Sequence, residues 1–253
     1  MNKVSSVLTR SFVSLLLDIM DLLITAFNEI LYRPLFNILV WLYNIIPGND
    51  LGIAIIVLTV GIKLVLYPLN QKAIRSQKTL QEIQPKIKEI QKKYKDKSQQ
   101  AEELLKLYKK TKINPFSGFL PILIQIPILI ALYKVFLGIN GNELNNLYAF
   151  ISKPEGLNPM FLGIVNLSEK NWILAGLAGI FQFIQSKMNE PKSGLNDKKT
   201  DFSYLLGKQM VYLMPVITIL IAGSLPSALA LYWIVITLFG IFQQWRLETK
   251  KTA

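Results

Sequence analysis

The stretch LGIAIIVLTVGIKLVLYPLN, residues 51–70, decides the fold. It carries a single charged residue, Lys63. As a helix it would extend about 30 Å, which is the thickness of a bilayer's hydrocarbon core. Pro68 stands near its end, where a proline distorts a helix least. The stretch therefore predicts a membrane-spanning helix.

Four more apolar stretches follow, so that five spans are predicted: about 51–70, 116–138, 171–186, 209–223 and 227–245. The composition agrees, because 51% of the 253 residues are hydrophobic and only 17% are charged. The third and fourth spans would be only about 24 and 22 Å long, and short spans thin a bilayer locally. We expect an all-α integral membrane protein built on a five-helix core bundle over 51–245.

The loop charges predict the orientation of this core. The segment 72–112 has 13 basic and 5 acidic residues, a net charge of +8, whereas 140–170 has a net charge of −1. The loop 187–208 and the short basic tail 246–253 are both net positive. Positive loops stay in the cytoplasm, so we expect a multi-pass protein of the bacterial cell membrane with a cytoplasmic C-terminus.

Residues 1–50 form a separate N-terminal region in this interpretation. Polar residues recur every three or four positions along 11–32 and so form one stripe of a helix. These residues are Ser11, Ser14, Asp18, Asp21, Thr25, Asn28 and Tyr32. The helix either lies in the membrane interface or crosses the membrane, and two mid-membrane aspartates would oppose crossing by ~2.5–3.5 kcal/mol each. The segment from Pro34 to Pro47 is too short to span and predicts an interfacial helix on the outer face.

The segment 72–112 has the pattern of a cytoplasmic helical hairpin. One apolar face comprises Leu80, Ile83, Ile87, Ile90 and Tyr94, and a second comprises Ala101, Leu104, Leu105 and Tyr108. Between them Asp96 and Gln99 can form a capping box, and Pro85 should kink or restart the first helix. The hairpin is either a solvated scaffold or a docking surface for head groups, ribosomal RNA or a nascent chain. The docking lysines would be Lys86, Lys88, Lys92, Lys93 and Lys95.

Lys63 is the most informative residue of the core. Its ammonium either reaches the inner interface along its aliphatic stem or faces a wet cavity between helices. Thr59 lies one turn away on the same face. Glutamines of other spans can line the same cavity or form hydrogen bonds between helices. They are Gln125, Gln182, Gln185, Gln243 and Gln244. The five predicted spans contain no Asp or Glu, so such a cation would attract an external anion.

Several function classes are excluded by what the sequence lacks. It has no cysteine and no histidine, which removes thiol chemistry, the commonest general base and the commonest metal ligand. No catalytic motif is present, so we predict a protein that is not an enzyme and needs no cofactor or metal. A solute transporter would show repeats and several ionisable mid-membrane residues, whereas the predicted spans show no repeat and Lys63 as the one lysine deep within a span. A structural scaffold for assembling other complexes stays open.

Elements in a fixed order resemble the YidC/Oxa/Alb family of membrane protein insertases, most closely the short bacterial type. They are QPK at 84–86, NPFSG at 114–118, QIP at 125–127 and LPSALALYW at 225–233. The resemblance runs from about Leu31 to Gln244 and implies a membrane protein insertase and chaperone. Its groove would be hydrophilic, open to cytoplasm and lipid, and would hold a cation that attracts an acidic client region.

The resemblance also assigns positions. Lys63 stands where the family normally has arginine, so it keeps the charge but lacks the bidentate fork. The hairpin would recruit clients. The implied partners are nascent membrane proteins and the lipid bilayer, together with a ribosome or a Sec-type translocon, and no small-molecule substrate. The positions that match groove-lining or substrate-contacting residues are Thr59, Gln125, Tyr232 and Trp233.

Overall fold

The computed structural model describes residues 2–111, 114, 120–138, 144, 146–188 and 202–252, and most of them are helical. The N-terminal helices are α1 (Asn2–Phe27), the π-helix η1 (Asn28–Tyr32) and α2 (Arg33–Ile45). The others are α3 (Leu51–Val65), α4 (Tyr67–Lys93), α5 (Lys97–Thr111), α6 (Leu120–Gly138), α7 (Trp172–Met188), α8 (Phe202–Ser224) and α9 (Ser227–Thr252). The described residues also include one antiparallel pair of strands, β1 (Met160–Phe161) and β2 (Val165–Asn166). This pair is a small addition to the expected all-α fold.

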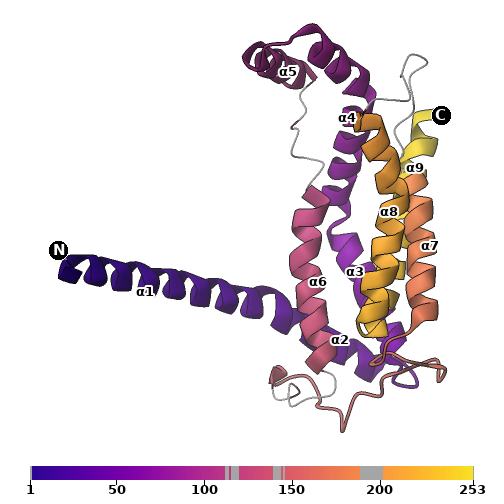
Figure 1. Ribbon diagram of the computed structural model, residues 1–253. Helices are drawn as coiled ribbons and strands as arrows, with labels where there is room; N and C mark the ends of the chain where they lie inside the picture. The colour runs from indigo at the N-terminus through magenta and orange to yellow at the C-terminus, as the bar shows by residue number, and fades with distance from the viewer. Residues whose placement is uncertain are drawn as a thin grey trace.

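The helices α3, α6, α7, α8 and α9 stand side by side as a bundle, and the first part of α4 continues within it (Figure 1). The rest of α4 and α5 lie beyond one end of the bundle, and α2 lies near the other. The main core lies where α2, α3, α6 and α9 meet, and Phe36, Leu39, Leu132 and Tyr232 are almost fully buried there. On the other side α7 packs along α8 and α9. Small residues make that contact close, because Ala175, Ala222 and Ala230 cluster there with no exposed surface.

The first predicted span differs from the structure at its end. The helix expected over 51–70 stops at Val65, and α4 begins at Tyr67 with an axis bent by 66°. Pro68 lies in the first turn of α4, where its missing N–H has no intrahelical partner to lose. The bend therefore comes before the proline, and residues 67–70 lie in α4 rather than in α3.

The helix α8 has 23 residues and starts at Phe202, before the predicted fourth span 209–223, whose length stays a prediction. Backbone hydrogen bonds carry a helix past the edge of its apolar run, which is all that hydropathy detects. Among the described residues one helix, Ser227–Leu247, is long and apolar enough to cross a bilayer alone. The bent pair Leu51–Val65 and Tyr67–Leu80 meets that test together, while Leu123–Gly138 and Val211–Ser224 are shorter apolar helices. The first residues of the predicted span 116–138 lie outside the described ones.

The hairpin consists of two helices joined at Asp96. The Asp96 carboxylate accepts hydrogen bonds from the backbone N–H of Gln99 (3.2 Å) and Ser98 (3.4 Å), so it caps α5. This is one half of the predicted capping box, and the described residues do not show the reciprocal bond from the Gln99 side chain. Ile83 and Ile87 are buried, whereas Leu105 is 57% exposed. The first helix runs through Pro85 without restarting.

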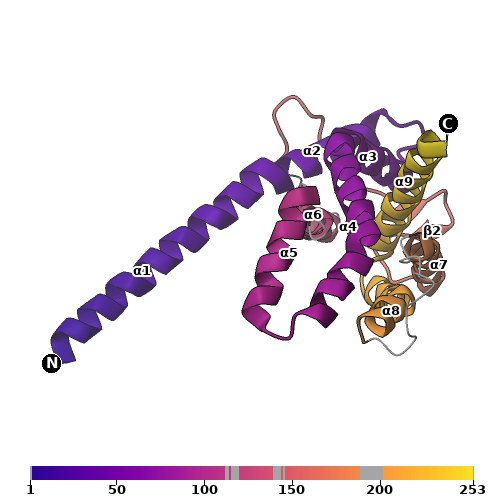
Figure 2. The same cartoon turned by 90° about the horizontal axis from the view of Figure 1, so that it is seen from above.

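The long helix α1 projects away from the bundle (Figures 1 and 2). Every side chain from Val13 to Thr25 is exposed, the apolar ones as much as Asp18 and Asp21. The helix continues through η1 into α2, which is held to the 144–152 region by Asn37. This buried amide donates to the Asn146 carbonyl oxygen (3.3 Å) and accepts from the Tyr148 N–H (2.6 Å). Both alternatives for α1, a helix that lies in the membrane interface and a helix that crosses the membrane, stay predictions.

Candidate functional site

Lys63 lies in the last turn of α3 and is half-buried. Thr59, one turn before it, is 1% exposed and donates its hydroxyl to the Ile55 carbonyl oxygen (2.6 Å). Within the described part of the chain, Lys63 forms no hydrogen bond or ion pair. A half-buried ammonium without a carboxylate keeps its attraction for an anion supplied from outside.

Gln125 and Tyr232 join α6 to α9. The Gln125 side-chain amide donates to the Tyr232 hydroxyl, and Tyr232 is 1% exposed. Trp233 follows on the next face of α9 and is half-buried. Two of the predicted site positions, from segments more than a hundred residues apart, are thus in direct contact.

The remaining glutamines divide between the two sides of α9. The amide of Gln243 donates to the Tyr67 carbonyl oxygen (3.2 Å) at the α3–α4 bend, and Gln243 shares a helix face with Tyr232, three turns away. Gln244 donates to the Met188 carbonyl oxygen (3.1 Å) at the end of α7. Gln185 lies against Gly240, also between α7 and α9. Gln182 is half-buried and has no hydrogen bond among the residues that the structure describes.

These contacts separate the predicted site residues into two groups. Gln125, Tyr232 and Gln243 connect α9 to the α3, α4 and α6 side of the bundle. The side chain of Gln185 instead faces the α7–α9 contact, so it does not join the other three. Gln243 and Gln244 form hydrogen bonds between helices, whereas Gln185 lies beside α9 without such a bond in the described part of the chain. Gln182 has no such contact within the described chain.

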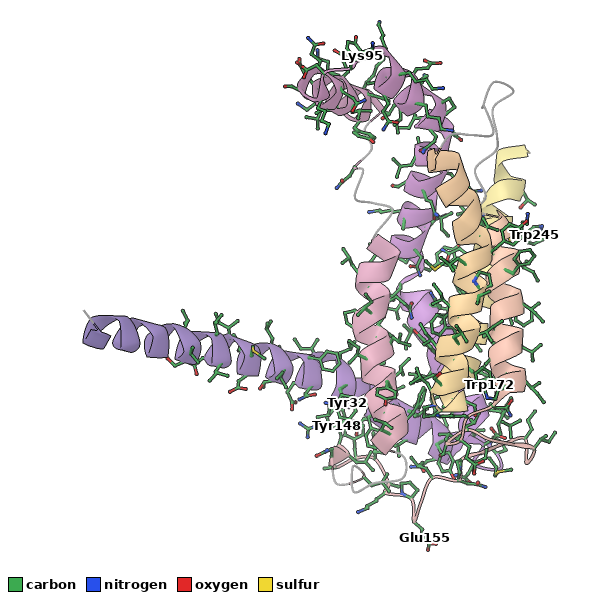
Figure 3. All side chains as sticks on the ribbon, in the orientation of Figure 1. Tyr32, Lys95, Tyr148, Glu155, Trp172 and Trp245 are labelled. Atoms are coloured by element: carbon green, nitrogen blue, oxygen red, sulfur yellow. The ribbon has the colours of Figure 1, made fainter. Side chains whose placement is uncertain are left out.

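The hairpin lysines lie at the opposite end of the molecule from Glu155 (Figure 3). Lys86, Lys92, Lys93 and Lys95 are exposed, and Lys88 is half-buried and has an interaction partner. On α5 Lys106 is held by two carboxylates: hydrogen bonds to Glu103 and Glu102, both 2.9 Å, raise the pKa of its ammonium. Only some of the hairpin's cations are therefore free for another anion.

Sequence reasoning missed a cluster around Lys134 of α6. The ammonium of Lys134 donates to the side-chain oxygen of Asn28 (2.9 Å) and lies 4.7 Å from the ring centre of Tyr32. Asn28 and Tyr32 are both in the polar stripe noted for the N-terminal helix. The stripe indicated a common face, but nothing in the sequence indicated that this face meets α6.

Apolar helices joined by buried amide and hydroxyl contacts, with a half-buried cation at the end of one helix, are typical of an α-helical membrane protein with a partly polar interior. The chain belongs to the 60Kd inner membrane protein family, the family of the YidC insertases, whose family model matches residues 41–253. The resemblance drawn from the ordered motifs is thus confirmed.

Individual relatives support the same family. The membrane protein insertase YidC of Oceanobacillus iheyensis is 36% identical over 80% of this chain and 77% of its own length. The YidC of Clostridium tetani is 40% identical over 74% of this chain and 77% of its own length. A crystal structure of an active YidC insertase with its first transmembrane domain resolved is similar with a TM-score of 0.53 and 29% identity. That match covers 86% of this chain, which spans about half of the solved one (48%).

Proposed function

We propose that this chain is an inner-membrane insertase and chaperone that moves hydrophobic segments of nascent membrane proteins into the bilayer. The observation that carries the proposal is Lys63, a half-buried cation in the last turn of an apolar helix with no carboxylate partner in the described chain. Membership of the YidC family supports the activity. The proposed reaction is a transfer between environments, so no covalent step, metal or cofactor takes part in it.

The proposed role of Lys63 is to attract the acidic flank of a client segment. Two unit charges 4 Å apart attract by about 1 kcal/mol in water and by about 4 kcal/mol at an effective dielectric constant of 20. A carboxylate therefore gains most from the ammonium where both are partly shielded from solvent. The client's apolar segment then enters lipid beside the bundle, and burial of its apolar surface drives release.

The proposed surroundings of this cation are a five-span core over 51–245 with a hydrophilic groove open to the cytoplasm and to lipid. Gln125 and Tyr232 lie between α6 and α9 and support a polar boundary for that groove. Thr59, Gln182, Gln185, Trp233 and Gln243 belong to the same proposal. In the proposed topology the hairpin and the tail 246–253 are cytoplasmic, because both carry net positive charge.

The hairpin is proposed to make the first contact with a client. Lys86, Lys92, Lys93 and Lys95 are exposed on it, and its apolar residue Leu105 is 57% exposed. A surface of this kind can contact both the acidic and the apolar parts of an unfolded chain. Contact with a ribosome or a Sec-type translocon would use the same cytoplasmic end.

The test replaces Lys63 by Arg, Ala and Glu and follows insertion of a single-span client with an acidic exported tail. We expect Lys63→Arg to retain activity, Lys63→Ala to lower the insertion rate about tenfold, and Lys63→Glu to lower it further. The charge reversal Lys170→Glu, on the exposed outer loop, is the matched control, and this variant should insert the client at the normal rate. A client whose acidic residues are replaced by glutamine should respond little to any change at Lys63. Full activity of Lys63→Glu would refute the electrostatic role.

A further inference from the structure

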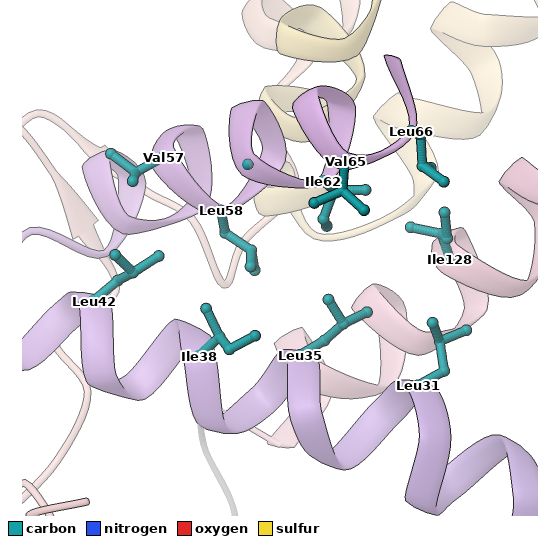
Figure 4. A pocket seen from close by; sticks show the side chains of 11 residues that line it. Leu31, Leu35, Ile38, Leu42, Val57, Leu58, Ile62, Val65, Leu66 and Ile128 are labelled. Carbon is teal, nitrogen blue, oxygen red and sulfur yellow. The ribbon is translucent and has the colours of Figure 1, made fainter. Parts of the chain in front are cut away.

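A continuous apolar groove lies between the N-terminal helices and α3 (Figure 4). Leu31, Ile38 and Leu42 form one wall, Val57 and Val65 belong to the other, and Ile128 of α6 stands at one end. The groove has a volume of about 470 Å³, and apart from Gly61 its lining residues all have aliphatic side chains. It differs from the proposed client groove, whose residues are polar.

The lining decides the chemistry of the occupant. No lining side chain can donate or accept a hydrogen bond, so an occupant with polar atoms would lose hydrogen bonds to water without replacement. The volume falls within the range of about 300–1,000 Å³ that is typical of pockets for single small ligands. A helix is about 10–12 Å across with its side chains, so the volume of three turns of a client helix is at least roughly twice the volume of the groove. A single aliphatic chain meets both requirements.

Charge at one end of the groove identifies what the aliphatic chain belongs to. Leu31 lies in η1 between Asn28 and Tyr32, the two residues that contact the ammonium of Lys134. Lys134 is exposed and has no carboxylate partner in the described chain, and the nearby Glu29 is paired with Arg33 (3.1 Å). An unneutralised cation beside an apolar groove complements a phosphate that is joined to a hydrocarbon chain.

We propose that the groove between α2 and α3 binds one acyl chain of a membrane phospholipid, whose phosphate lies at Lys134 and Asn28. The bound chain completes the packing of α2 against α3 over the length of the groove. The inference does not depend on the proposed insertase activity, because it rests on the groove and on Lys134 and not on Lys63.

Gly61 offers a direct way to fill the groove. It lies in the groove wall, and a Cβ atom added there meets nothing within 4 Å. Gly61→Phe should therefore place a ring in the groove without disturbing the backbone. Gly176 of α7 is equally open, so Gly176→Phe is a matched control outside the groove.

The experiment uses the full chain in vesicles of phosphatidylethanolamine and phosphatidylglycerol, with a trace of phosphatidylglycerol that carries a photoreactive diazirine in one acyl chain. After irradiation, mass spectrometry maps the labelled peptides. We expect labelling of the α2 and α3 peptides, its loss in Gly61→Phe, and no change in Gly176→Phe. Lys134→Gln should lower labelling roughly tenfold through loss of a charged hydrogen bond, whereas Lys170→Gln on the outer loop should not.

Three results would overturn the proposal. Labelling of the groove that persists in Gly61→Phe, or that only equals labelling of the exposed α7 residues Ile173 and Ile180, would indicate ordinary lipid contact. A photoreactive residue at Ile38 that captures a client polypeptide in place of lipid would identify the groove as a client site. Insertion activity is measured separately, so failure here leaves the role of Lys63 untouched.

Discussion

At the scale of single residues, the contact between Gln125 and Tyr232 links the two helices that border the proposed client groove. Tyr232 is almost fully buried, and the Gln125 amide donates to its hydroxyl. Hydrogen bonds between helices in a bilayer contribute about 0.6 kcal/mol on average and at most about 1.7 kcal/mol. This bond therefore positions two side chains more than it stabilises the fold.

A double-mutant cycle tests this contact. Tyr232→Phe and Gln125→Leu should each destabilise the protein, and the two together should do so by about 0.5–1.5 kcal/mol less than the sum, because the bond can be lost only once. The free energy of unfolding is measured in mixed micelles with increasing denaturing detergent. Strictly additive effects would show that the two side chains are not coupled.

At the scale of elements, α7 and α8 form the most extensive helix–helix contact among the described residues. Gly179 permits this approach, because a Cβ atom there would collide with the Ile219 side chain and would lie 3.3 Å from the Pro215 carbonyl oxygen. Small residues at such positions let helix backbones pack tightly without a hydrophobic driving force from water. The length of the apolar run in each helix does not predict how closely the two helices pack.

The α7–α8 contact predicts a contrast between two glycines of the same helix. Gly179→Leu should lower the free energy of unfolding by about 1–3 kcal/mol through overpacking. Gly176→Leu makes the same chemical change where there is open space, and it should be neutral or stabilising because leucine favours a helix more than glycine does. Thermal unfolding of both variants in detergent gives the comparison. Equal losses for the two would argue against tight packing at Gly179.

At the scale of the whole molecule, charge predicts which end faces the cytoplasm. Lys95 and Glu155 mark opposite ends of the bundle (Figure 3), and they belong to the strongly positive and the slightly negative segment respectively. Because the chain has no cysteine, single cysteines report on topology without background. The orientation of the bundle can therefore be measured one position at a time.

We expect Glu155→Cys to react with a membrane-impermeant maleimide in spheroplasts, where the outer surface is open to the reagent. Lys95→Cys should react only after the membrane is opened, because the positive hairpin stays inside. Thr249→Cys, in the C-terminal part of α9, should behave like Lys95→Cys. The reverse pattern would invert the proposed topology and would place the hairpin where it cannot meet a nascent chain.

The sequence by itself determined the helical membrane class, the basic hairpin with its Asp96 cap, and the family. Those features follow from local composition, spacing and ordered motifs, which each segment carries without its neighbours. Only the tertiary structure decided that Gln125 meets Tyr232, that Gln185 of α7 faces Gly240 of α9, that Lys134 joins Asn28, and that an aliphatic groove opens beside α3. Such contacts join residues distant in sequence, and they depend on the rotation and spacing of packed helices, which hydropathy does not encode.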